Sequence, residues 1–282
     1  MTTSWPGGAR CAVAFTFDVD AESPLLAVRP DFADRMTTMS QQAYGPEVGV
    51  PRLLGLLGGL GVRSTFFVPG FTARRYPEAI RAIAAAGHEI AHHGYLHEPL
   101  TGKSVTEEAE LLDAGLAALA EVAGVTPAGY RAPFWEATWH TPALLADRGF
   151  LYDSSLMNSD HPYELAAGLE RSVVELPISW GLDDWGQYCY VPEFSGNGMI
   201  ADPVAVCAMW RQDFEAMREA GGLWILTSHP FLTGRPGRAG ALRALVEHVA
   251  AQPDVWVAPL AEIAAHVRSL GLPPRQLSKP VL

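Results

Sequence analysis

The sequence has little of what marks several large classes of protein. Its three cysteines, Cys11, Cys189 and Cys207, are scattered and make neither a disulfide framework nor a zinc knuckle. No apolar run approaches the ~18–20 residues that a membrane-spanning helix needs. The first apolar run, 11–17, ends at Asp18 without a cleavage site and does not resemble a secretory signal. These absences predict a reduced, cytoplasmic protein.

Positive charge is also scarce. Lys and Arg number 20 against 31 Asp and Glu, which gives a formal net charge of −11. Such a surface repels nucleic acid and anionic membranes, and no basic run relieves the repulsion. By contrast, 49% of the 282 residues are apolar, enough to bury a sizeable core. The composition therefore predicts a compact globular protein with neither nucleic acid nor membrane as a partner.

Apolar, β-rich runs alternate with segments of helical period along the whole chain. Repeated strand–helix alternation predicts parallel strands with helices outside. We expect one domain over 1–282, a distorted (β/α) barrel of seven or eight units, with a doubly wound open sheet as the alternative. The connection 21–46 has little periodicity and is expected to be a long loop acting as a lid, a binding loop or a subunit contact. The expected strands are 11–17, 63–70, 88–94, 128–134, 150–155, 172–180, 223–229 and 255–259.

Ionisable residues gather at the carboxyl ends of the expected strands. In a barrel these ends converge on one face, where catalytic groups collect. A random scatter of charges would not favour the same end of five strands, so the pattern predicts a single active site. The residues are Asp18, Asp20, His93, His97, Arg131, Asp183, Asp184 and His229.

The residue types in this set suit metal-assisted hydrolysis. Two imidazoles four residues apart plus one carboxylate make a facial ligand set that leaves positions open for water and substrate. Asp20 could complete that set with His93 and His97, while Asp18 stays free as a base. His229 could protonate a leaving amine.

Each residue also has a structural interpretation when taken alone. A strand-end aspartate often forms a turn or a helix cap, and Arg131 could simply join a salt bridge. His229 could merely end its strand. His88 and His92 are expected to be structural, because His92 should face away from His93 on an extended chain. The joint occurrence of all these residues, in this order, favours the active site.

With those residues assembled, the chain resembles the polysaccharide deacetylase superfamily, the NodB-homology group of metal-dependent hydrolases. The likeness runs from about Cys11 to Arg268. It rests on five ordered motifs, "TFDVD", "HEIAHHGYLHE", "GYRAPFWE", "YDSSLM" and "LTSHP". The resemblance implies a distorted (β/α) barrel that binds a divalent metal, usually zinc, with cobalt, nickel or manganese as alternatives.

The resemblance also implies a role for each site residue. Asp20, His93 and His97 would be the metal ligands, Asp18 the general base and His229 the general acid. The remaining residues would support them. Arg131 would orient the base, Asp184 would tune the acid, and the backbone N–H near Phe134 would stabilise the oxyanion. Aromatic side chains could line the pocket or belong to the core; they are Phe134, Trp135, Trp185 and Tyr188.

Two departures from the usual motifs point to a subgroup. Val19 separates the two aspartates, and Gly94 follows the first ligand histidine. Both resemble a cytoplasmic subgroup of peptidoglycan-deacetylase-like proteins, cyclic imide hydrolases and allantoinase-like enzymes, whose members suggest a homo-oligomer, either a dimer or a tetramer. We expect a hydrolase of non-peptide C–N bonds that deacetylates an N-acetylated sugar or polysaccharide. Hydrolysis of a small cyclic imide is the first alternative, and a non-catalytic sugar-binding protein is the second.

Overall fold

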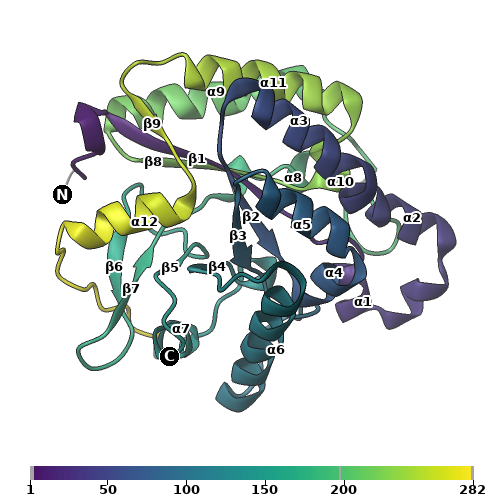
Figure 1. The fold of residues 1–282 in the computed structure, drawn as a ribbon, viewed down its shortest axis with the longest axis horizontal. Helices are drawn as coiled ribbons and strands as arrows, with labels where there is room; N and C mark the ends of the chain where they lie inside the picture. Colours follow the sequence, from purple (N-terminus) through teal and green to yellow (C-terminus); the bar gives the residue numbers. More distant parts are fainter. Residues whose placement is uncertain (1–2, 197, 281–282) are drawn as a thin grey trace.

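A curled, mainly parallel β-sheet with helices on its outside forms the centre of the molecule (Figure 1). It is seen in a computed structural model that describes residues 3–196 and 198–280. The strands run in the order β6-β7-β5-β4-β3-β2-β1-β8, and β9 also pairs with β1. Their bounds are β1 Cys11–Asp18, β2 Thr65–Val68, β3 Glu89–His92, β4 Gly129–Tyr130, β5 Tyr152–Asp153, β6 Tyr163–Ala166, β7 Ser172–Glu175, β8 Leu223–Ser228 and β9 Val255–Val257.

Helices connect most successive strands, though not β5, β6 and β7, and α3, α9 and α11 lie together at the top of the view in Figure 1. The longest, α6, begins with a capping box between Ser104 and Glu107 and ends at Gly124 in the left-handed conformation. The bounds are α1 Ser23–Val28, α2 Met36–Tyr44, α3 Val50–Leu60, α4 Gly70–Arg75, α5 Pro77–Ala85, α6 Val105–Ala123, α7 Thr141–Asp147, α8 Trp185–Tyr188, α9 Pro203–Ala220, α10 Pro230–Thr233, α11 Pro236–Ala250 and α12 Leu260–Ser269.

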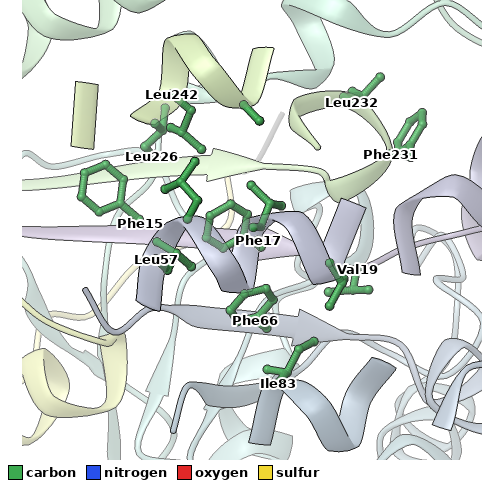
Figure 2. Close-up of a cluster of buried hydrophobic side chains, with 14 of the residues drawn as sticks. Phe15, Phe17, Val19, Leu57, Phe66, Ile83, Leu226, Phe231, Leu232 and Leu242 are labelled. Atoms are coloured by element: carbon green, nitrogen blue, oxygen red, sulfur yellow. The ribbon is translucent and has the colours of Figure 1, made fainter. Parts of the chain in front are cut away.

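Alternation along β1 sets the layers of the molecule. Phe15 and Phe17 point toward the helices, where Phe66 stacks on Phe17 with ring centroids 4.9 Å apart (Figure 2). Helix side chains such as Leu57 and Leu242 complete this core. Because successive strand residues point to opposite faces, the even-numbered residues of β1 point into the concave side of the sheet. These are Ala12, Ala14, Thr16 and Asp18, all buried.

The predicted fold is confirmed as a single α/β domain whose parallel-dominated sheet curls into a half-barrel. Not every strand follows the prediction. β6 was not expected and pairs with β7 antiparallel. β4 is only two residues long, because Pro133 has no N–H to extend the ladder and Phe134 takes a φ of 55°.

The stretch 21–46, expected to be a loop, is mostly helical. It contains α1, a 3₁₀ turn at Pro30–Asp34 and α2. Within α2 only Gln42 is buried, so this helix has no apolar stripe whose period the sequence could show. Across the described residues, every helix is too short or too polar to span a bilayer.

Candidate active site

The carboxyl ends of β1, β3, β4 and β8 bring most of the predicted residues to one edge of the sheet. Asp183, which pairs with Thr227 of β8, brings Asp184 to the same edge. Parallel pairing of neighbouring strands makes this convergence unavoidable. All of the following side chains are buried: Asp18, Asp20, His93, His97, Arg131, Asp183, Asp184 and His229.

Asp20, His93 and His97 form a compact cluster whose ligand atoms all lie within 4.8 Å of one another. His93 Nε2 is 3.5 Å from Asp20 Oδ1, and His97 Nε2 is 3.6 Å from Asp20 Oδ2. Asp20 Oδ1 is buried and has no hydrogen-bond partner, an arrangement that destabilises a carboxylate. A divalent cation would satisfy this oxygen, and two imidazoles with one carboxylate are a ligand set that suits zinc. The residues present therefore fit a metal.

The protonation states of the cluster also suit a cation. His93 Nδ1 donates to the carbonyl of Arg131 at 2.8 Å, which leaves Nε2 with a free lone pair. Burial lowers the pKa of His97 to about 4, so its ring is neutral near pH 7. Although burial opposes it, the neighbouring His97, His93 and His229 hold the pKa of Asp20 below its usual value. Near pH 7 the cluster thus presents the Asp20 carboxylate and the neutral ring of His97.

Beside this cluster lies an ion pair between Asp18 and Arg131. Arg131 Nη1 donates to Asp18 Oδ1 at 2.7 Å and to Thr16 Oγ1 at 3.1 Å. Trp135 Nε1 faces Asp18 Oδ2 at 3.5 Å, and that oxygen is 3.8 Å from His93 Nε2. Arg131 therefore holds one carboxylate oxygen of Asp18, and the other oxygen faces the cluster of Asp20, His93 and His97.

His229 is fixed from behind by Asp184. Its Nδ1 donates to Asp184 Oδ1 at 2.7 Å, and its backbone N–H donates to both carboxylate oxygens at 2.9 Å. The hydroxyl of Thr233 donates to Asp184 as well. His229 Nε2 points the other way, 3.4 Å from Asp20 Oδ2. Burial works against it, but the bonds to Asp184 and Asp20 raise the pKa of His229 well above its usual value.

These groups face a cavity of about 160 Å³. Phe134, Trp135 and Trp185 line it, whereas the sequence had left each of them open between pocket and core. Tyr188 does not: it is buried against Trp210 and beneath Arg238, in the core. The full lining is Asp18, Asp20, His93, His97, Phe134, Trp135, Trp180, Asp183, Trp185 and His229.

His88 and His92 lie outside the cluster. His88 Nδ1 accepts from the backbone N–H of Ser64 at 3.1 Å. His92 Nε2 donates to the carbonyl of Leu112 at 3.0 Å, and its Nδ1 accepts from the N–H of Gly94. Both nitrogens of His92 are thus engaged away from the cavity.

Comparisons with known proteins agree with this geometry. The family model for polysaccharide deacetylase matches residues 43–152. The peptidoglycan deacetylase of Helicobacter pylori is 30% identical over 271 residues, which cover 87% of this chain and 92% of that protein. The chain belongs to the polysaccharide deacetylase family.

Solved structures place this deacetylase-family chain among close and distant neighbours. A protein from Mycobacterium smegmatis whose crystal structure is named as that of a polysaccharide deacetylase is 64% identical in sequence. The two structures have a TM-score of 0.98 over 100% of this chain and 98% of that one. An allantoinase structure, at 24% identity, has a TM-score of 0.83 over 95% of this chain and 94% of that one. The second likeness shows a common fold.

Backbone strain in this deacetylase-family chain is concentrated around the cavity. Four of the six non-glycine residues with positive φ in the described ranges are His97 at 59°, Phe134 at 55°, Trp135 at 56° and Ala21, next to Asp20, at 50°. Such conformations persist where the surrounding structure fixes them, and they cluster at functional sites.

One residue that lines the cavity, Trp180, was not expected from the sequence. Trp180 stacks on Trp135, with ring centroids 4.5 Å apart and an interplanar angle of 21°. Its side chain is nevertheless 57% exposed. In the sequence it looks like the last residue of a strand. The available signal was an aromatic residue placed shortly before "GLDDW".

Proposed function

We propose that this chain is a metal-dependent hydrolase that removes the acetyl group from an N-acetylated sugar. The observation that carries the proposal is the unpaired Asp20 Oδ1 between two imidazoles, beside a separate carboxylate held by Arg131. The Asp20 cluster provides a place for a cation, and the carboxylate held by Arg131 remains free to act as a base. The Helicobacter pylori relative, a peptidoglycan deacetylase, supports the same class of substrate.

Asp20, His93 and His97 would hold the metal, with zinc expected. When bound, the ion polarises the amide carbonyl and acidifies water. Asp18 takes the proton of the attacking water through the oxygen that faces the cluster, while Arg131 keeps its other oxygen in place. The backbone N–H near Phe134 would stabilise the developing oxyanion, a contact worth ~2.7–4 kcal/mol for each donor.

His229 delivers the second proton. Asp184 accepts from Nδ1, so Nε2 is the atom that faces Asp20 and the cavity. As the C–N bond breaks, His229 gives a proton to the departing nitrogen, and the water oxygen stays with the acyl carbon. The products are acetate and the free amine of the sugar.

The test is acetate release from N-acetylglucosamine oligomers by purified protein supplied with zinc or cobalt. His97→Ala should abolish turnover, whereas the matched control His92→Ala, next to the cluster but not in it, should retain it. A metal-loaded protein that binds these sugars without releasing acetate would instead support the non-catalytic sugar-binding alternative.

The size of the cavity favours a second candidate, hydrolysis of a small cyclic imide or amide. Its volume of about 160 Å³ is below the ~300–1,000 Å³ of most ligand sites, and Trp180 and Trp185 narrow it. The same acid, base and metal ligands would open a ring. Turnover of succinimide, hydantoin or allantoin, with none of the N-acetylated sugars, would replace the first proposal by this one.

We further propose that the chain acts in the cytoplasm as a homo-oligomer, a dimer or a tetramer. Light scattering on the purified protein measures the oligomeric state, and fractionation of the source cells tests the location.

A further inference from the structure

Two buried carboxyl groups lie behind the active site and touch no part of the cavity. Asp153 on β5 and Glu175 on β7 are both fully buried, and they are direct partners in the parallel pairing of these strands. Their register places the two carboxyl groups side by side. Asp153 Oδ2 and Glu175 Oε2 are both buried without a hydrogen-bond partner. Two adjacent carboxyl groups in such a place share one proton, because both cannot ionise.

The surroundings assign the proton to Glu175. Burial raises the pKa of Glu175 well above its usual value and that of Asp153 to about 6. Asp153 is the better stabilised anion, since Ser155 Oγ donates to it and the charge of Arg131 favours its ionised form. At neutral pH Glu175 is therefore the protonated member of the pair, and it lies beside the Asp153 carboxylate.

A chain of hydrogen bonds leads from this pair to the active site. Ser155 Oγ donates to Asp153 Oδ1 at 2.5 Å and accepts from the backbone N–H of Ala132 at 2.9 Å. Ala132 begins the turn in which Phe134 and Trp135 both have positive φ. A strained turn keeps its shape only while its hydrogen bonds hold it.

The neighbouring Ser154 fixes Arg131 from the same segment. Its carbonyl accepts from Arg131 Nε at 3.1 Å, and its hydroxyl accepts from Nη2 at 3.2 Å. Glu175 also accepts, through Oε1, from the N–H of Leu156 at 2.9 Å. The end of β5 thus holds the arginine on one side and the strained turn on the other.

We propose that Glu175, Asp153 and Ser155 are positioning residues, which act through the Ala132 N–H to hold the 132–135 turn and Arg131 in the geometry of the reaction. The proposal rests on the proposed hydrolase function. None of the three residues touches the cavity. The negative charge of Asp153 strengthens the Ser155 oxygen as an acceptor, so the three members work as one network.

The central test compares turnover in Ser155→Ala and Asp153→Asn with that of the unchanged protein. Both variants should lower kcat, Ser155→Ala by about 10–100-fold, because small displacements of catalytic groups have effects of that order. Metal content should stay within about twofold of that of the unchanged protein, because the three ligands Asp20, His93 and His97 are not altered. Ser64→Ala is the matched control: it removes another buried serine hydroxyl, one with no partner, and should leave kcat unchanged.

Glu175 offers a rescue test. Glu175→Gln keeps an N–H that can donate to Asp153, so its kcat should remain close to that of the unchanged protein, whereas Glu175→Ala should lose about as much as Ser155→Ala. Melting temperatures of all variants separate loss of folded protein from loss of turnover. Folded, metal-loaded Ser155→Ala and Asp153→Asn with unchanged kcat would overturn the proposal.

A measurement without substrate keeps the two proposals distinguishable. The infrared difference spectrum between the unchanged protein and Glu175→Gln at pH 7 should contain the C=O band of a protonated carboxylic acid. Its absence would overturn the network even if the enzyme is active. Its presence, in a protein that hydrolyses none of the substrates above, would leave the shared proton established while the hydrolase function fails.

Discussion

Two buried clusters of aspartate and histidine lie at the same end of the sheet, and they differ in their hydrogen bonds. Asp20, His93 and His97 on one side, and Asp183, Asp184 and His229 on the other, each bring ligand atoms within 4.8 Å of one another. In the first cluster a carboxylate oxygen of Asp20 has no partner. In the second, Asp184 already accepts from two groups of His229 and from Thr233.

The difference shows why proximity of ligand atoms is not sufficient for a metal site. A metal ion at Asp20 Oδ1 would break no hydrogen bond. At Asp184 it would have to replace the hydrogen bonds that orient His229, the proposed acid. We therefore expect one ion for each chain, held by the first cluster.

His97→Ala should have the largest effect. It removes one ligand of three and should reduce both metal content and turnover, the latter on the order of 10³-fold or more, because the ion supplies several kcal/mol of charge stabilisation. Elemental analysis by mass spectrometry and acetate release measure the two quantities on one sample. If His97→Ala binds a full equivalent of metal, the first cluster is not the site.

Asp18→Asn should separate base from ligand. Metal content should stay near that of the unchanged protein while kcat falls about 10²–10⁴-fold, the usual contribution of general acid–base catalysis. The same metal analysis and acetate assay apply. Loss of the metal together with activity would show that Asp18, rather than Asp20, is the ligand.

Asp184→Asn should also leave the metal content unchanged, and its kcat should be about 10–100-fold lower. The amide cannot balance a charged His229, and one of its two acceptor oxygens is gone. The loss should be greatest for amides with poor leaving groups, which depend most on the proton from His229. A substrate series with graded leaving amines measures this dependence, and equal losses across the series would mean that His229 is not the acid.

The smallest effect is on stability and depends on pH. The folded state binds a proton at Glu175 that the unfolded chain releases above about pH 4.5, so this residue makes stability fall as pH rises beyond that value. Glu175→Gln should therefore gain stability relative to the unchanged protein from pH 5 to pH 8, by roughly 1–3 kcal/mol. Urea unfolding at both pH values measures the gain. Glu219→Gln, at an exposed position, is the control and should show no such trend.

Much of this arrangement could be predicted because it follows from local periodicity. A strand that alternates phenylalanine with small or polar residues, and then reads Asp-Val-Asp, must direct both aspartates to the same face. Parallel strands bring His93 and His229 to the edge where those aspartates lie.

The remainder depends on contacts between distant segments. Chain order does not show that β5 lies next to β7 with β6 outside them, and this order alone creates the Asp153–Glu175 pair. The polar helix α2 has no buried stripe to reveal it. The position of Trp180 depends on a turn after β7 whose path the sequence does not specify.

The stacked indoles of Trp135 and Trp180 give the protein an optical signal of its own. Aromatic rings held 4.5 Å apart and nearly parallel couple their electronic transitions, and one of these rings also faces Asp18 while the other meets solvent. A molecule that enters the cavity and shifts Trp135 changes that coupling. The near-ultraviolet circular dichroism of the unlabelled protein would thus record occupancy of the cavity directly, without a dye or a chromogenic substrate.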